Sequence, residues 1–158
     1  MNPFLLHACH QSIFGGVAAA GFAVLFNCKP RNLPFYFGAG ALALALRTIG
    51  QEYGLSLAVA SFFSALALAI IDRAIRSFPA PSGSVLPLVG AIAMLPGSLA
   101  AKVFVNIFAF LRTGQSRGSY SMMTTWADLI MLIFTLAALG TALALPLLVA
   151  PARTKGEN

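Results

Sequence analysis

The sequence predicts an all-α protein, a polytopic membrane bundle of about five transmembrane helices in which the fourth is broken. Only 9% of the 158 residues are charged and 59% are hydrophobic, whereas soluble domains are about a quarter charged. The chain also contains long apolar segments, and about 20 apolar residues let a helix cross a hydrocarbon core of roughly 30 Å. These segments lack the alternation of strands, so helices are the economical way to satisfy their backbone in lipid.

Turn-forming or charged residues close each apolar segment. The first segment is expected to end at the basic link around Pro30, the second at Gly50, and the third at the charged Asp72. A loop containing Pro79 precedes the fourth, and Pro151 follows the fifth before a charged tail. We therefore expect one integral-membrane domain over residues 1–158, with spans at about 4–26, 33–49, 55–71, 85–111 and 122–149.

Pro96 and Gly97 interrupt the fourth segment. Proline has no amide hydrogen and clashes with the carbonyl four residues earlier, so we expect a kink or break that leaves the Ile92 carbonyl unpaired. A new half-helix would then begin at Gly97 and Ser98, with its amides and positive dipole end at mid-membrane. Secondary transporters use this arrangement to hold a substrate carboxylate. The alternative is a packing kink without a ligand, since proline and glycine are common in spanning helices.

A polar stripe follows the break on the same predicted helix. Ser98, Lys102 and Asn106 recur every four residues, which places them within roughly an 80° arc of one face. An ammonium at bilayer depth costs several kcal/mol, so Lys102 is expected to line an aqueous path or meet an acidic partner. Snorkelling toward the nearer interface is the alternative. The candidate substrate-binding residues are therefore Pro96, Gly97, Ser98, Lys102 and Asn106.

Three other residues are candidates for coupling transport to protons. Asp128 is expected to be the only acidic residue within a span. It would act as a proton carrier or as the counter-ion of Lys102. The alternative is that it lies at the outer interface as a charge at the start of a helix. His7 and His10 share a face near the start of the first helix, where they form a proton relay or only an interfacial polar patch. Arg47, near the end of the second helix, is either functional or an interface anchor.

The sequence argues against several other functions. Cys9 and Cys28 lie roughly 28 Å apart along one predicted helix, too far for a disulfide. Neither a metal-ligand motif nor a Ser-His-Asp order, a nucleotide-binding loop or an HExxH pattern is visible. We therefore expect no enzyme, no cofactor and no metal. The net charge of +6 could suggest nucleic acid, but Lys and Arg lie mainly at segment ends and act as topology signals.

The distribution of Lys and Arg predicts the orientation. With the amino end outside, the cytoplasmic side carries Lys29, Arg31, Arg73, Arg76, Arg153 and Lys155, and the outer side carries Arg47, Arg112 and Arg117. Cytoplasmic connections are generally the more basic ones, which favours the amino end outside and the carboxyl end in the cytoplasm. This prediction requires an odd number of spans, and a re-entrant loop at Pro96 would make the number even.

Two stretches of sequence resemble a known family. They are Gly21-Phe22-Ala23-Val24-Leu25-Phe26-Asn27, with Arg31 just beyond, and Ala91-Ile92-Ala93-Met94-Leu95-Pro96-Gly97-Ser98. Both are similar to the carboxyl-terminal half of the threonine/serine exporter (ThrE) superfamily, in particular its separate small-subunit form, the YjjB-like proteins. The resemblance covers nearly the whole chain. It marks Asn27, Arg31 and Arg47 as motif residues and does not extend to Lys102.

This resemblance implies a secondary exporter of small carboxylate metabolites in the bacterial inner membrane, with threonine or serine as substrates in one branch and dicarboxylates such as succinate in another. It also implies a larger multi-span subunit that resembles the amino-terminal half of the exporter, with the site at the interface of an inverted repeat. Small residues at packing spacing, as in Gly16-x-x-x-Ala20 and Ala39-x-x-x-Ala43, leave room for a homo-oligomer. The competing hypothesis is a non-transporting membrane scaffold or assembly subunit.

Overall fold

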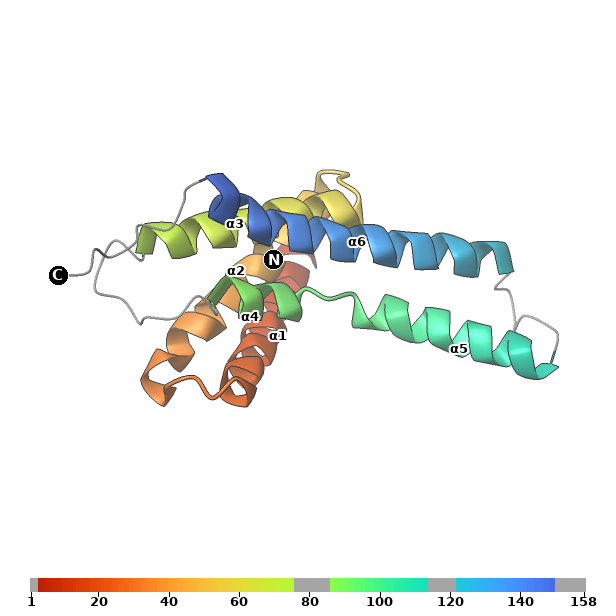
Figure 1. The fold of residues 1–158 in the computed structure, drawn as a ribbon, viewed down its shortest axis with the longest axis horizontal. Helices are drawn as coiled ribbons and strands as arrows, with labels where there is room; N and C mark the ends of the chain where they lie inside the picture. The colour runs from red at the N-terminus through yellow and green to blue at the C-terminus, as the bar shows by residue number, and fades with distance from the viewer. Residues whose placement is uncertain (1–2, 76–85, 114–121, 150–158) are drawn as a thin grey trace.

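A computed structural model describes residues 3–75, 86–113 and 122–149, and Figure 1 shows their arrangement. The elements are α1 (Pro3–Leu25), the short 3-10 helix η1 (Pro30–Asn32), α2 (Leu33–Glu52), α3 (Leu57–Ile75), α4 (Leu86–Ala93), α5 (Gly97–Thr113) and α6 (Met122–Val149). The described part is helical apart from short connections, which confirms the predicted all-α class. Four helices are long and apolar enough to cross a membrane, and α4 with α5 makes a fifth if that bent pair is one span. The predicted loop at 77–84, the tail, and the cations at positions 76, 117, 153 and 155 lie outside the described residues.

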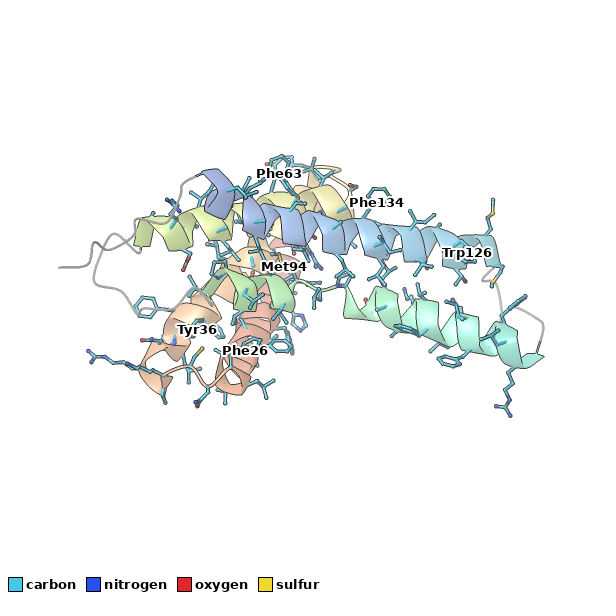
Figure 2. The ribbon with its side chains drawn as sticks, in the orientation of Figure 1. Phe26, Tyr36, Phe63, Met94, Trp126 and Phe134 are labelled. Carbon is cyan, nitrogen blue, oxygen red and sulfur yellow. The ribbon has the colours of Figure 1, made fainter. Side chains whose placement is uncertain are left out.

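The helices form two parts, which we call the body and the arm. In the body, α1 and α2 make an antiparallel hairpin, α4 packs across them, and α3 packs beside the second half of α6 (Figure 1). The arm consists of α5 and the first part of α6, which extend side by side away from the body (Figure 1). The core of the body is built from small side chains around a few large ones, with Leu68, Val89 and Met94 almost fully buried. Figure 2 shows Met94 at the centre, where the body meets the arm.

The break in the fourth segment is confirmed, and it is a true end of a helix. α4 stops at Ala93, α5 starts at Gly97, and their axes are bent by 50°. The prediction of an unpaired Ile92 carbonyl was wrong, because the amide of Leu95 donates to it at 3.1 Å. The last turn tightens to three-residue hydrogen bonds, a common way for a helix end to satisfy its carbonyls. The clash caused by Pro96 is therefore relieved by ending the helix early.

The direction of α5 bears on the number of spans. A re-entrant loop reverses its direction, whereas a bend of 50° lets α5 continue in the general direction of α4. α3 and α6 both run opposite to this pair, and their ends meet where Arg73 Nη1 donates to the Pro146 carbonyl at 3.3 Å (Figure 1). Between the end of α3 and the start of α6, the chain therefore crosses back through the bent pair, as it would through a single broken span.

Asn27 has a structural explanation. It follows α1 with a φ of 55°, in the left-handed region. The amide of Asn27 donates to the Val24 carbonyl at 2.9 Å, and that of Cys28 donates to the Ala23 carbonyl at 3.0 Å. This pair of bonds is the Schellman motif, which closes a helix with a left-handed residue, usually glycine and sometimes asparagine. Asn27 in the family motif thus turns the chain at the end of α1.

Glycines set the distance between α1 and α2. A Cβ placed on Gly40 would overlap the Gly15 carbonyl oxygen and the Ala19 methyl, and one on Gly16 would lie 2.7 Å from the Phe37 ring. Ala39 and Ala43 are also buried within the chain. The small-residue spacings noted in the sequence therefore contribute to packing inside the body, where close approach requires them.

Replacing Gly40 with leucine is expected to destabilise the hairpin. The new side chain would collide with the backbone of α1, and overpacking typically costs about 1–3 kcal/mol or more. Gly38→Leu is the matched control, because a Cβ there meets nothing within 4 Å. Thermal unfolding in detergent should show a lower Tm for Gly40→Leu alone. Equal Tm values for the two variants would contradict this packing.

One predicted boundary was wrong in a way that affects function. The third helix was expected to stop at Asp72, but α3 continues to Ile75 and Asp72 is buried. Ser61, Ala65, Leu68 and Asp72 form one buried face with helical spacing. Asp128 is therefore not the only acidic residue within a span. The sequence carried this signal, because Asp72 continues the spacing of the apolar stripe.

Candidate functional site

A cavity of about 370 Å³ lies at the break between α4 and α5. Small-molecule sites generally have volumes of roughly 300–1,000 Å³, so a metabolite of a few carbon atoms fits here. All described helices except η1 and α6 contribute to the wall. The lining residues are Gln11 from α1, Leu44 and Arg47 from α2, Leu57 from α3, Ala93 from α4, Leu95 and Pro96 from the connection, and Gly97, Ser98, Leu99 and Lys102 from α5.

Arg47 joins α2 to the break. Its Nη1 donates to the Met94 carbonyl at 2.6 Å, and its side chain is half-buried. That carbonyl lies just beyond the end of α4, where helix carbonyls lack internal partners and the helix dipole favours a cation. Arg47 is therefore directed into the protein, toward the break. Its Nε is buried without a hydrogen-bond partner in the described part of the chain.

The start of α5 presents amides to the same cavity. The amide of Gly97 is occupied, since it donates to the Leu95 carbonyl at 2.8 Å. Regular helical bonding begins when the Ala100 amide donates to the Pro96 carbonyl at 3.0 Å. Between these positions, the amides of Ser98 and Leu99 have no acceptor inside the helix. Both residues line the cavity, so the helix end that attracts anions is directed at it.

Lys102 supplies a second cation, one turn after Ser98. It lines the cavity and its side chain is exposed, whereas the half-buried Asn106 is absent from the lining. The predicted polar stripe is therefore divided, with its first two members at the cavity. The structure places no ion pair on Lys102 or Asp128 within the described ranges, and the cavity lining contains no acidic residue. The two charged residues of the described lining are thus both cationic.

Two candidate proton carriers, Asp128 and His10, are absent from the described cavity lining. Asp128 is half-buried on α6, and His10 is exposed with its ring centroid 4.6 Å from that of Phe14. The side chain of His7 lies outside the described part of the structure. Asp72, missed by the sequence reasoning, is buried on α3 and interacts electrostatically with Tyr36. Tyr36 and Arg47 are roughly 16 Å apart along α2, so Asp72 and the cavity occupy different levels of the body.

The described residues offer no metal site. No group of three or more His, Cys, Asp or Glu side chains that could hold a metal ion is found among them. Cys9 and Cys28 are both free thiols. The chemistry available at the cavity is therefore binding by cationic side chains and backbone amides.

These features define a multi-pass helical membrane protein with a cationic cavity at a broken helix. Residues 11–149 match the family described as threonine/serine exporter, ThrE. The chain belongs to this family, which confirms the resemblance seen in the sequence.

One curated relative shows how the chain compares in length. The chain is 25% identical over 143 residues to an uncharacterised protein of Haemophilus influenzae (strain ATCC 51907 / DSM 11121 / KW20 / Rd). The match covers 90% of this chain and 48% of the relative, so the chain spans about half the length of that protein. No solved structure matches the chain.

Proposed function

We propose that the chain is the small membrane subunit of a two-component secondary exporter that binds the carboxylate of a small metabolite in the cavity. The observation that carries this proposal is the convergence of Arg47, Lys102 and the amides at the start of α5 on one cavity. Arginine pairs with carboxylates through its planar fork of donors, and a helix amino end favours anions. Membership of the exporter family supports export over a scaffold role.

The charges at the cavity favour dicarboxylates such as succinate over threonine or serine. A dicarboxylate has two anionic groups, which match Arg47 and Lys102. An amino acid also carries an ammonium group, and none of the described lining residues has a carboxylate to pair with it. A buried charge without a partner costs several kcal/mol. An amino acid would therefore need an acidic side chain from another subunit, while a dicarboxylate would not.

The length of the relative supports a second component. About half of that protein lies outside the match. In the relative, a segment of similar length is therefore joined to the matched half in the same polypeptide. We infer that a larger multi-span subunit provides this unit here, in a bacterial inner membrane, with the site at the interface of an inverted repeat. The basic connections favour an orientation with the amino end outside and the carboxyl end in the cytoplasm. The exposed apolar surface is also compatible with homo-oligomers.

Coupling to protons completes the proposal. Asp128, His7 and His10 remain the candidates from the sequence, and the structure adds Asp72, because intramembrane carboxylates commonly serve proton pathways. Asp72, Asp128 and His10 are absent from the described cavity lining, so coupling through these groups would act through helix movement rather than through direct contact with the substrate.

Efflux measurements test this function directly. Cells that express the chain with its presumed larger partner are loaded with labelled succinate or threonine, and export is followed with and without the chain. We expect Lys102→Met to lower succinate export about 10- to 100-fold, because a charge-assisted hydrogen bond contributes about 1.5–3 kcal/mol. Arg112→Met is the matched control, since Arg112 is exposed near the end of α5 and absent from the cavity lining. Export that persists without the chain would favour the competing hypothesis of a non-transporting membrane scaffold.

A further inference from the structure

Three buried polar atoms lack a hydrogen-bond partner among the described residues. They are Arg47 Nε, Ser61 Oγ and Ser64 Oγ, and the two serines are 0% and 2% exposed. A hydroxyl on a helix can donate to the carbonyl four residues earlier, as those of Thr48 and Thr135 do. A buried polar group without any partner is costly, so such groups are uncommon in folded proteins. Each of these three atoms therefore indicates a partner that the described chain does not provide.

The two serines lie on the inward face of α3, next to the cavity. Leu57 lines the cavity, and Ser61 and Ser64 follow it by one and two turns on the same face of the helix. Along the axis they are about 6 Å and 11 Å beyond Leu57. Leu68, one turn further, contacts α4, because a Cβ built on Gly90 would lie 2.6 Å from its side chain. The serines are therefore placed between the cavity and the contact of α3 with α4.

Arg47 lies opposite Ser64 across the pair formed by α2 and α3. These helices touch at Gly50 and Ala60, where a Cβ built on Gly50 would lie 3.2 Å from the Ala60 Cβ. A short connection joins them, so they run in opposite directions. Arg47 precedes Gly50 by about one turn and Ser64 follows Ala60 by about one turn. Both are therefore about 5–6 Å from the contact, in the same direction and on facing sides of the two helices.

The donors that remain on Arg47 match a carboxylate. Its Nη1 is occupied by the Met94 carbonyl, which leaves Nε and Nη2. An N–H of each points in the same direction, and together they form the fork that binds both oxygens of a carboxylate. With the hydroxyls of Ser61 and Ser64 they make four donors, and a carboxylate offers about four acceptor positions. No carboxylate is found among the described lining residues, so a bound anion is the acceptor that suits these donors.

We propose that Arg47, Ser61 and Ser64 form an inner subsite that binds one carboxylate of the substrate, while Lys102 and the start of α5 bind the other. This inference rests on the proposed function and deepens it, because it assigns a separate place to each end of a dicarboxylate. Both hydroxyls are covered in this structure, so the carboxylate reaches them only when α3 and the break move apart. Alternating access requires a helix movement of this kind.

Alanine substitutions test the inner subsite, because stability and binding should respond differently. Ser61→Ala and Ser64→Ala each remove a hydroxyl without a partner, so the Tm of the ligand-free protein should stay the same or rise. The Kd for succinate, measured by isothermal titration of the chain in complex with its presumed larger partner, should rise roughly tenfold for each substitution. The reason is the loss of a hydrogen bond to a charged group.

Thr135→Val is the matched control for these variants. Thr135 is as buried as the serines, but its hydroxyl already donates to the Met131 carbonyl, so the Kd should equal that of the wild type. A wild-type Kd in both serine variants would overturn the subsite alone. A lower Tm together with a wild-type Kd would show that the hydroxyls hold only structural water, with the same consequence. Absence of succinate binding to the wild-type complex would instead overturn the proposed function, and the subsite with it.

Double substitutions test which residues bind the same carboxylate. Residues that act on separate groups have additive effects on the free energy of binding, whereas residues that share a partner do not. The increases in Kd caused by Ser64→Ala and Lys102→Met should therefore multiply when the two are combined. Those of Ser64→Ala and Arg47→Lys should combine to less than their product. The reverse pattern would overturn the assignment of Ser64 to the carboxylate bound by Arg47.

Discussion

Replacing Arg47 with glutamine is expected to reduce export to the background level. The guanidinium group satisfies the Met94 carbonyl at the break and also lines the cavity, so its loss has two effects. A buried carbonyl without a donor costs about 1–3 kcal/mol, and loss of a hydrogen bond to a charged substrate costs about 1.5–3 kcal/mol. Together these correspond to a reduction of roughly 100-fold or more in export.

A comparison with Arg47→Lys separates the two effects. Lysine keeps the positive charge but lacks the planar fork that donates to two acceptors at once. We expect Arg47→Lys to retain measurable export with a raised KM. Arg47→Gln has neither the positive charge nor the planar fork, so its export should fall to background. Arg112→Gln provides a control, because Arg112 is exposed near the end of α5 and absent from the described cavity lining. With equal amounts of each variant in the membrane, an Arg47→Gln variant that exports at the wild-type rate would refute this site.

Replacing Gly97 with tryptophan is expected to block export while leaving the fold intact. Gly97 lines the cavity, and a Cβ built on it meets nothing within 4 Å. A large side chain can therefore grow into the cavity without displacing the backbone, and it would occupy the space proposed for the substrate. Gly97→Ala adds only a methyl group to this open space, so it should export nearly as well as wild type.

The measurement is export by both variants at matched membrane levels, together with Tm in detergent. Gly21→Trp is the matched control, because a Cβ at this exposed glycine of α1 also meets nothing within 4 Å. We expect Gly97→Trp and Gly21→Trp to have similar Tm values and very different export. Normal export by Gly97→Trp would show that the substrate does not pass through this cavity.

Hydropathy and proline placement were sufficient to predict the helices and the break. Long apolar segments must form helices in lipid because their backbone has no other partners there. Pro96 must interrupt a helix because it lacks a donor. The pattern failed at Asp72, where a charged residue was taken as a helix end although its side chain packs into the body. It also failed at the Ile92 carbonyl, because a tightened last turn supplied the missing donor.

By itself, the sequence determined the helical membrane class, the position of the break and the cationic residues near it, because these depend on composition and on properties of neighbouring residues. Only the tertiary structure decided that Arg47 reaches Met94, a residue 47 positions away, that Asn106 is absent from the cavity lining, and that α5 extends away from the body. These features depend on the bend between α4 and α5 and on how α1, α2 and α3 pack around it. Such packing joins residues far apart in the chain, and local periodicity carries no information about those distances.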